Sequence, residues 1–78
     1  MFTIKFYDLK GRERILAAVS FTVIDDAQVS GGYEITVHQS NSADDDIHTV
    51  GAKGPWVVAY IVNANGKTVA TYRTNPVE

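Results

Sequence analysis

The chain contains no cysteine. Without thiols it can form neither a disulfide framework nor a zinc site built on thiolates. Because disulfides are typical of oxidising compartments, their absence favours a reducing, cytoplasmic setting. At 78 residues we expect one domain spanning residues 1–78. A domain this small buries only about 60% of the surface that its unfolded chain exposes.

Long apolar runs are also absent. No uncharged apolar stretch approaches the roughly 20 residues of a membrane helix. Lys5 and Asp8 interrupt the first residues, so these do not form the apolar core of a signal peptide. The sequence therefore predicts a soluble domain that has no membrane partner.

Lysine and arginine are missing from residues 16–50, which carry six acidic residues. Residues 1–15 carry four basic against two acidic residues, and residues 51–78 carry three against one. Nucleic-acid-binding domains usually show a basic excess or stripe, so the acidic middle disfavours nucleic acid as the partner. It fits a protein partner with a basic patch, or simply a solvated surface.

Two turn sequences resemble each other, DLKGR at residues 8–12 and NANGK at residues 63–67. In both, an Asp or Asn can accept backbone hydrogen bonds and start a type I turn. The glycine that follows can take the left-handed conformation that closes a bulged hairpin. We therefore predict two β-hairpins.

Alternation of apolar and polar residues predicts half-buried strands at residues 2–7 (FTIKFY) and 33–38 (YEITVH). Residues 56–62 (WVVAYIV) are apolar on both faces. Such a strand is either covered on both sides or leaves one face for a partner. Trp56, at its start, is accordingly either a core residue or an exposed binding anchor.

The register of the second hairpin decides which side chains share a face. If Gly66 closes a bulged turn, Tyr60 faces Ala70 and Val58 faces Tyr72. One face then presents Trp56, Val58, Tyr60, Val62, Ala70 and Tyr72, and the other presents Val57, Ala59, Ile61, Val69, Thr71 and Arg73. A two-residue turn at Asn65-Gly66 would instead shift the register by one and exchange the faces of the second strand.

Residues 12–25 (RERILAAVSFTVID) exceed the usual five or six residues of a strand. We expect them to bend, or to break near Ser20 into two strands that serve two sheets. A short helical turn near residues 14–19 is the alternative. The sequence thus predicts an all-β fold, a small antiparallel barrel or sandwich of five to six strands, with a frayed tail at residues 75–78.

Residues 39–55 have no periodicity and are expected to form a long acidic loop. Its aspartates, Asp44, Asp45 and Asp46, are consecutive, so their side chains diverge instead of converging on one ion as in calcium loops. His38 and His48 lack the paired spacing of a structural zinc site. We therefore expect no metal and no cofactor.

No catalytic motif is present, because the chain has neither a nucleophile elbow nor an HExxH sequence. We expect a non-enzymatic binding module that acts by stoichiometric protein–protein interaction, a class common among phage and mobile-element accessory proteins. The candidate binding residues are Trp56, Val58, Tyr60, Tyr72 and Arg73, because aromatic residues and arginine are enriched in binding hot spots. An uncovered aromatic face also predicts a homodimer.

Two other function classes remain open. In the first, a β-barrel binds a small ligand, with Trp56 and Tyr60 stacked on a flat ring and Arg73 on an anionic group. A deep concavity beside Trp56 would favour this class, and a flat surface would favour a protein partner. In the second, the basic hairpin tip binds nucleic acid through Lys10, Arg12 and Arg14.

Overall fold

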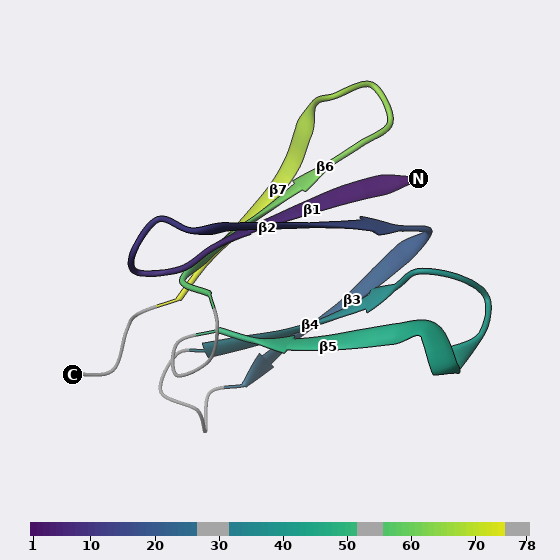
Figure 1. Ribbon diagram of the computed structural model, residues 1–78, viewed down its shortest axis with the longest axis horizontal. Helices are drawn as coiled ribbons and strands as arrows, with labels where there is room; N and C mark the ends of the chain where they lie inside the picture. Colours follow the sequence, from purple (N-terminus) through teal and green to yellow (C-terminus); the bar gives the residue numbers. More distant parts are fainter. Residues whose placement is uncertain (27–31, 52–55, 75–78) are drawn as a thin grey trace.

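The computed structural model describes residues 1–26, 32–51 and 56–74, which form two antiparallel β-sheets stacked as two layers (Figure 1). The four-stranded sheet has the order β2-β1-β6-β7, and the three-stranded sheet has the order β3-β4-β5. The strands are β1 (Phe2–Tyr7), β2 (Glu13–Ala18), β3 (Ser20–Asp26), β4 (Gly32–His38), β5 (Asp46–Val50), β6 (Val58–Val62) and β7 (Thr68–Arg73). The predicted all-β fold is confirmed. The sheets do not close, so the barrel alternative is wrong, and the described ranges hold seven strands instead of five or six.

The chain passes from one layer to the other at Val19. Its backbone N–H donates to the carbonyl oxygen of His38 at 2.8 Å, which fixes the corner between β2 and β3. The predicted break near Ser20 is therefore confirmed. The helical turn near residues 14–19 is wrong, because β2 pairs with β1 along its whole length.

Both hairpin turns have the chemistry that the sequence predicts. Oδ1 of Asp8 accepts hydrogen bonds from the backbone N–H groups two and four residues later, both at 2.9 Å. Oδ1 of Asn63 does the same at 3.0 Å. Gly11 and Gly66 have φ angles of 78° and 81°, in the left-handed region that glycine tolerates best.

The hairpin of β6 and β7 also contains a bulge that the turn sequence does not predict. Ile61 faces Ala70, whereas the next residue, Val62, faces Thr68. Val69 is therefore the extra residue on β7. A bulge of this kind changes the face on which every later side chain of the strand lies.

Because of this bulge, the partners of Tyr60 and Val58 expected from the bulged turn are wrong by one residue, and the strands here have the alternative register that is shifted by one. Tyr60 faces Thr71 instead of Ala70, and Val58 faces Arg73 instead of Tyr72. Tyr72 consequently turns inward, where its ring meets that of Tyr33 in the other sheet at 5.5 Å between centroids. The contact across the sandwich gives a physical reason for the shifted register.

The core lies between the two layers. Its buried apolar side chains are Ile4, Phe6, Ala18, Ile35, Val37, Trp56, Ala59 and Ile61. Besides Tyr33 and Tyr72, the rings of Phe2 and Phe21 join the sheets, with centroids 5.3 Å apart. Each strand contributes alternate side chains to this core, as half-buried strands do.

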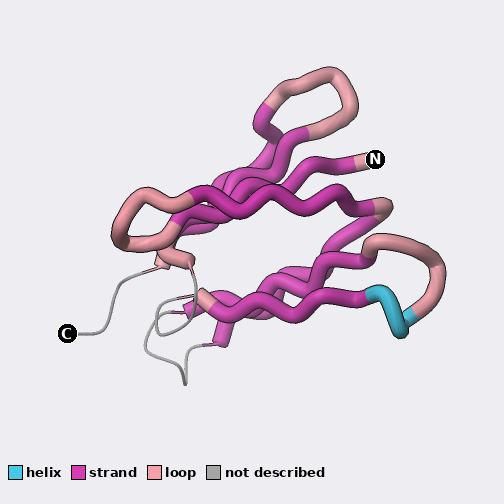
Figure 2. The backbone as a smooth tube through the Cα atoms, in the orientation of Figure 1, coloured by secondary structure: helices cyan, strands magenta, loops and turns pink. Residues whose placement is uncertain are grey.

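Part of the predicted acidic loop is a strand. A 3₁₀ helix at Ala43–Asp45 leads directly into β5, which pairs with β4 (Figure 2). The loop prediction is therefore wrong for residues 46–50, where Ile47 and Thr49 alternate with outward-facing neighbours. Residues 52–55 of that prediction and the tail 75–78 lie outside the described residues. No helix in the described ranges is long and apolar enough to cross a membrane.

Candidate functional site

Trp56 lies in the core, just before β6. It is 1% exposed, and its ring packs on that of Phe6 with centroids 5.5 Å apart. Gly51 pairs with it in an isolated bridge and leaves room for the indole, since a Cβ there would come within 3.1 Å of the ring. The indole N–H has no acceptor among the described residues, which is uncommon for a buried donor. Of the two roles that the sequence left open for Trp56, the structure shows the core position.

Val58, Tyr60 and Arg73 lie on the opposite side, on the outer face of the four-stranded sheet. The face consists of three cross-strand rows, which are Ala17-Thr3-Val62-Thr68, Ile15-Lys5-Tyr60-Thr71 and Glu13-Tyr7-Val58-Arg73. Its apolar members are half-buried by their neighbours, apart from the more exposed Ala17 and Ile15, the latter 52% exposed. No described element packs over this surface, which we call the outer face (Figure 1).

Tyr7 lies on β1 in an end row of the outer face. Its ring meets that of Tyr60 edge-on, with centroids 5.7 Å apart, a favourable aromatic geometry. Its hydroxyl donates to the carboxylate of Glu13, and this hydrogen bond raises the pKa of Tyr7 above its ordinary value. Tyr7 thus stays a neutral phenol, and the Glu13 carboxylate is held against it.

The predicted binding residues therefore do not form one site. Trp56 and Tyr72 face the core, while Val58, Tyr60 and Arg73 share the outer face. The arrangement considered for a small ligand, with Trp56 and Tyr60 on one ring and Arg73 beside them, is not formed.

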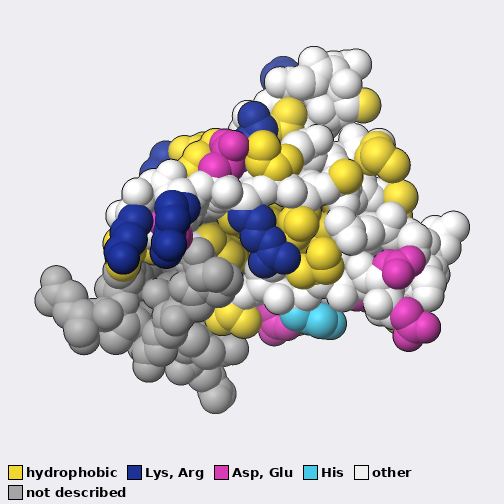
Figure 3. All heavy atoms as spheres, in the orientation of Figure 1, with side chains coloured by type: hydrophobic (Ala, Val, Ile, Leu, Met, Phe, Trp, Pro, Cys, Tyr) yellow, Lys and Arg dark blue, Asp and Glu magenta, His cyan; other side chains and the backbone are white. Residues whose placement is uncertain are grey.

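Charge is segregated between the layers. Residues 1–19 and 58–73, which build the four-stranded sheet, carry six basic and two acidic side chains. Residues 20–50, which build the other sheet, carry six acidic side chains and no lysine or arginine. On the side shown in Figure 3, Lys and Arg gather over the β1–β2 hairpin, and acidic side chains lie toward the 3₁₀ helix. The charge blocks of the sequence thus become a basic layer and an acidic layer.

The predicted basic tip is partly neutralised. Nε of Arg12 lies 2.7 Å from Oδ2 of Asp8. The pKa of Asp8 is lowered, first because the backbone N–H of Arg12 donates to its carboxylate and further because of the Arg12 side chain and the backbone N–H of Lys10. Lys10, Arg12 and Arg14 are all exposed, and Arg14 lies opposite Phe6 in the register of the edge strand β2.

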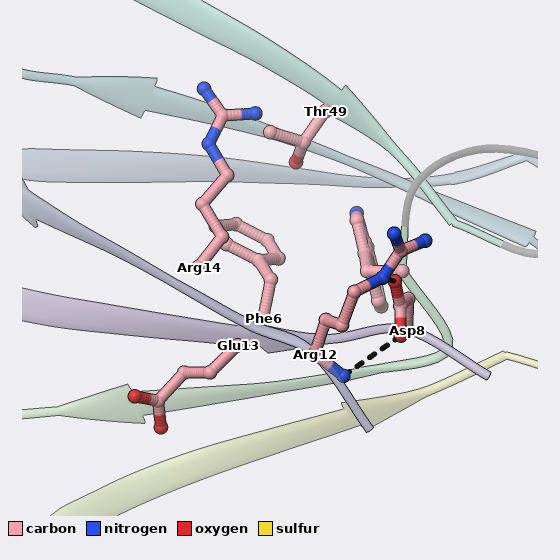
Figure 4. A pocket seen from close by; sticks show the side chains of 7 residues that line it. Phe6, Asp8, Arg12, Glu13, Arg14 and Thr49 are labelled. Atoms are coloured by element: carbon pink, nitrogen blue, oxygen red, sulfur yellow. Dashed lines mark hydrogen bonds and ion pairs between the residues drawn. The ribbon is translucent and has the colours of Figure 1, made fainter. Parts of the chain in front are cut away.

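A pocket of about 200 Å³ lies beside Trp56, lined by Phe6, Asp8, Arg12, Glu13, Arg14, Thr49 and Trp56 (Figure 4). Arg12 and Arg14 extend to the same side of β2, toward Thr49, while Glu13 points the opposite way. The concavity is real but smaller than the roughly 300–1,000 Å³ of drug-sized ligand sites.

The acidic residues occupy separate environments. Asp44 and Asp45 are exposed, and Asp45 accepts a hydrogen bond from the hydroxyl of Ser40 at 2.6 Å. Asp46, at the start of β5, lies 2.9 Å from Nδ1 of His38, with its side chain only 16% exposed. In the described part of the chain, no three His, Asp or Glu side chains are placed to hold a metal ion.

His38 also connects to Thr22, whose hydroxyl lies 2.9 Å from Nε2. The order Thr22–His38–Asp46 has the connectivity of a nucleophile, base and carboxylate. Strand pairing alone produces these two contacts, because His38 lies directly opposite Asp46 and diagonally opposite Thr22. The open depression of about 380 Å³ beside His38 is lined by Ser20 and Ser40, among others, but not by Thr22. Among the described residues, this depression therefore does not present the Thr22 hydroxyl to a substrate.

In comparisons with known proteins, no family model, no curated protein and no solved structure matches the chain. The class that the fold defines is a small antiparallel β-sandwich domain.

The pairing of Arg14 with Phe6, which brings Arg14 to the pocket, is the feature of the site that the sequence analysis does not predict. The turn at residues 8–12 implies that Tyr7 faces Glu13, and hence that Phe6 faces Arg14, on the inner side of the sheet. The signal was present in the first hairpin. Proximity in sequence to Lys10 and Arg12 instead suggests that Arg14 belongs to the solvated tip.

Proposed function

We propose that the chain is a non-enzymatic binding module that docks a protein partner on the outer face. The observation that carries the proposal is that β6 is apolar on both sides while only its inner side is covered by described elements. Val58, Tyr60 and Val62 lie one in each of the three rows, on β6, an inner strand of the sheet. Exposed apolar surface of this kind, rimmed by charged residues, is typical of interaction sites.

The outer face is smaller than the area that one partner buries in a stable interface. Four strands about 4.8 Å apart and six residues at about 3.3 Å each give an area of roughly 400 Å². A stable interface uses about 800 Å² per partner. A partner that binds stably must therefore also contact the hairpin tips at the two ends of the sheet.

The charge of this rim indicates the chemistry of the partner. Lys5 and Arg73 lie on the outer face itself, and Glu13 is engaged by Tyr7. Lys10 and Lys67 are exposed at the two tips. A partner that combines apolar side chains with acidic ones, including one near the centre opposite Lys5, complements this surface. A second copy docked face to face would place like charges against each other, which is unfavourable.

The proposal is tested by comparing three immobilised proteins, the wild type, Tyr60→Glu and Ile24→Glu, in a lysate of the native host. Tyr60 stands in the centre of the outer face, and Ile24 is a matched apolar control, 49% exposed on the acidic layer. Circular dichroism checks that all three are folded.

We expect an acidic protein that the wild type and Ile24→Glu retain and that Tyr60→Glu loses. Its retention should fall as salt is raised, because exposed charge pairs are screened. If Tyr60→Glu and Ile24→Glu capture the same proteins, the outer face is not the docking surface. If the outer face binds a second wild-type chain instead, the acidic-partner proposal is replaced by a homodimer.

A further inference from the structure

We infer that the pocket beside Trp56 binds a small aromatic carboxylate. This pocket opens on the inner side of β2, between the two layers, and of the outer-face residues only Glu13 also lines it, with its side chain directed away. Ligand binding in the pocket and partner docking on the outer face can therefore be tested separately.

The volume of the pocket sets the size of the ligand. An apolar cavity of about 150 Å³ holds a benzene molecule. The pocket here measures about 200 Å³, which leaves room for one ring and a carboxylate. A larger cofactor would not fit.

The charge at the mouth of the pocket selects an anion. Arg14 has no ion-pair partner among the described residues. Arg12 is paired with Asp8 through Nε, and its two terminal nitrogens are directed to the same side as the Arg14 guanidinium (Figure 4). Arginine presents its N–H groups as a planar fork, which matches both oxygens of a carboxylate.

The two acidic residues at the pocket do not cancel this preference. Asp8 accepts hydrogen bonds from two backbone N–H groups and from Arg12, so its charge is already compensated. Glu13 points away from the pocket and receives the hydroxyl of Tyr7. The charge that stays available to a ligand is that of Arg14.

The aromatic side chains on the inner wall of the pocket favour a ligand that carries an aromatic ring. Phe6 and Trp56 line it and already meet in a tilted contact at 5.5 Å, a geometry that a third ring could extend. The buried indole N–H of Trp56 lacks an acceptor in the described part of the chain. A ligand oxygen that reached it after a small shift of the ring would satisfy this donor.

The test uses the indole N–H of Trp56 as a reporter, since the chain has one tryptophan and therefore gives one indole signal in a proton–nitrogen correlation spectrum. Benzoate, benzyl alcohol and inorganic phosphate are titrated separately into the full chain. We expect a saturable benzoate shift with a Kd of about 1 mM or tighter. Benzyl alcohol, which has the ring without the charge, should bind at least about tenfold more weakly.

Matched variants assign the charge to a residue. Arg14→Gln should weaken benzoate binding at least about tenfold, whereas Lys67→Gln, which removes a charge from the opposite hairpin tip, should leave it unchanged. The dispersion of the spectra confirms that both variants are folded.

Four results would overturn the inference. These are no saturation by about 10 mM benzoate, equal binding of benzyl alcohol, a phosphate shift as strong as that of benzoate, and equal effects of Arg14→Gln and Lys67→Gln. The comparison of benzoate with benzyl alcohol needs only the wild type, so it decides the question even if Arg14→Gln fails to fold.

Discussion

Replacing Trp56 with alanine should remove a large part of the stability of the fold. The side chain is 1% exposed, and burial of an indole removes about 150–250 Å² from water, worth about 4–6 kcal/mol. Burying the unpaired indole N–H costs about 1–3 kcal/mol, which reduces the free energy gained from burial of the ring. The expected loss is therefore about 1–5 kcal/mol and centred near 3 kcal/mol, the low end of the range for large-to-small core substitutions of this size.

This loss is large for a small domain. A chain of this length has a total stability of about 4–12 kcal/mol, so a loss near 3 kcal/mol removes about a quarter to three quarters of it. Urea unfolding followed by far-ultraviolet circular dichroism measures the change, since the variant lacks the only tryptophan fluorophore. Trp56→Phe, which keeps an aromatic ring and removes the unpaired N–H, should lose only about 1–2 kcal/mol.

Ile15→Ala is the control, because Ile15 is 52% exposed on the outer face and should change the free energy of unfolding by less than about 1 kcal/mol. The reasoning is refuted if Trp56→Ala costs no more than this control. It is also refuted if wild-type fluorescence is red-shifted and quenched by iodide, since a buried indole is protected from both.

Four further outcomes are expected. Gly51→Ala should destabilise the fold by about 1–3 kcal/mol, because a Cβ there lies 2.5 Å from Cγ2 of Thr74; thermal unfolding that matches the wild type would contradict the close approach. Asp46→Asn should cost about 0.5–1.5 kcal/mol by weakening the contact with its histidine partner, while the exposed Asp44→Asn should stay within about 0.5 kcal/mol; equal urea midpoints would show that both are solvated. The pKa of Asp8 is lowered in the folded state. The Asp8 carboxylate therefore contributes stability that is present above its unfolded-state pKa and is lost as pH falls through its folded-state pKa. The melting temperature of Asp8→Asn, which should keep the turn, is expected to fall less than that of the wild type between neutral and acid pH, and equal falls would contradict this. Light scattering at micromolar concentration should give a monomer near 8.5 kDa, because the outer face alone is too small for a stable dimer; a mass of twice this value would restore the homodimer.

The features that the sequence predicted correctly depend on local chemistry. Asp8 and Asn63 start their turns through their own side chains, and Gly11 and Gly66 take positive φ angles. These preferences act over five residues and need no knowledge of the rest of the fold. The break near Ser20 could be predicted because residues 12–25 are too long for a single strand.

The features that the sequence did not predict depend on distant contacts. The bulge at Val69 is coupled to the meeting of Tyr72 with Tyr33, which lies in the other sheet. The strand at residues 46–50 places Thr49, a polar residue, on the inner face, where its hydroxyl donates to the carbonyl of Ile35 at 2.9 Å. Strand preference depends on such surroundings more than on the residue itself.

The same distinction applies to the candidate site. The sequence predicts Val58, Tyr60 and Arg73 as candidate binding residues, and the structure groups them on one open surface. It could not separate them from Trp56, because the chain between Trp56 and β6 does not continue the strand's alternation. An irregularity of one residue between Trp56 and β6 therefore places the Trp56 ring in the core instead of on the outer face.

The central claim, that the outer face docks a protein partner, is tested most directly by photo-crosslinking in the native host. A photo-reactive phenylalanine derivative is placed at Tyr60 in one variant and at Ile24, on the opposite layer, in another. We predict one light-dependent adduct with an acidic protein from position 60 and none from position 24. Adducts from position 24 alone, or from neither position, would contradict the claim.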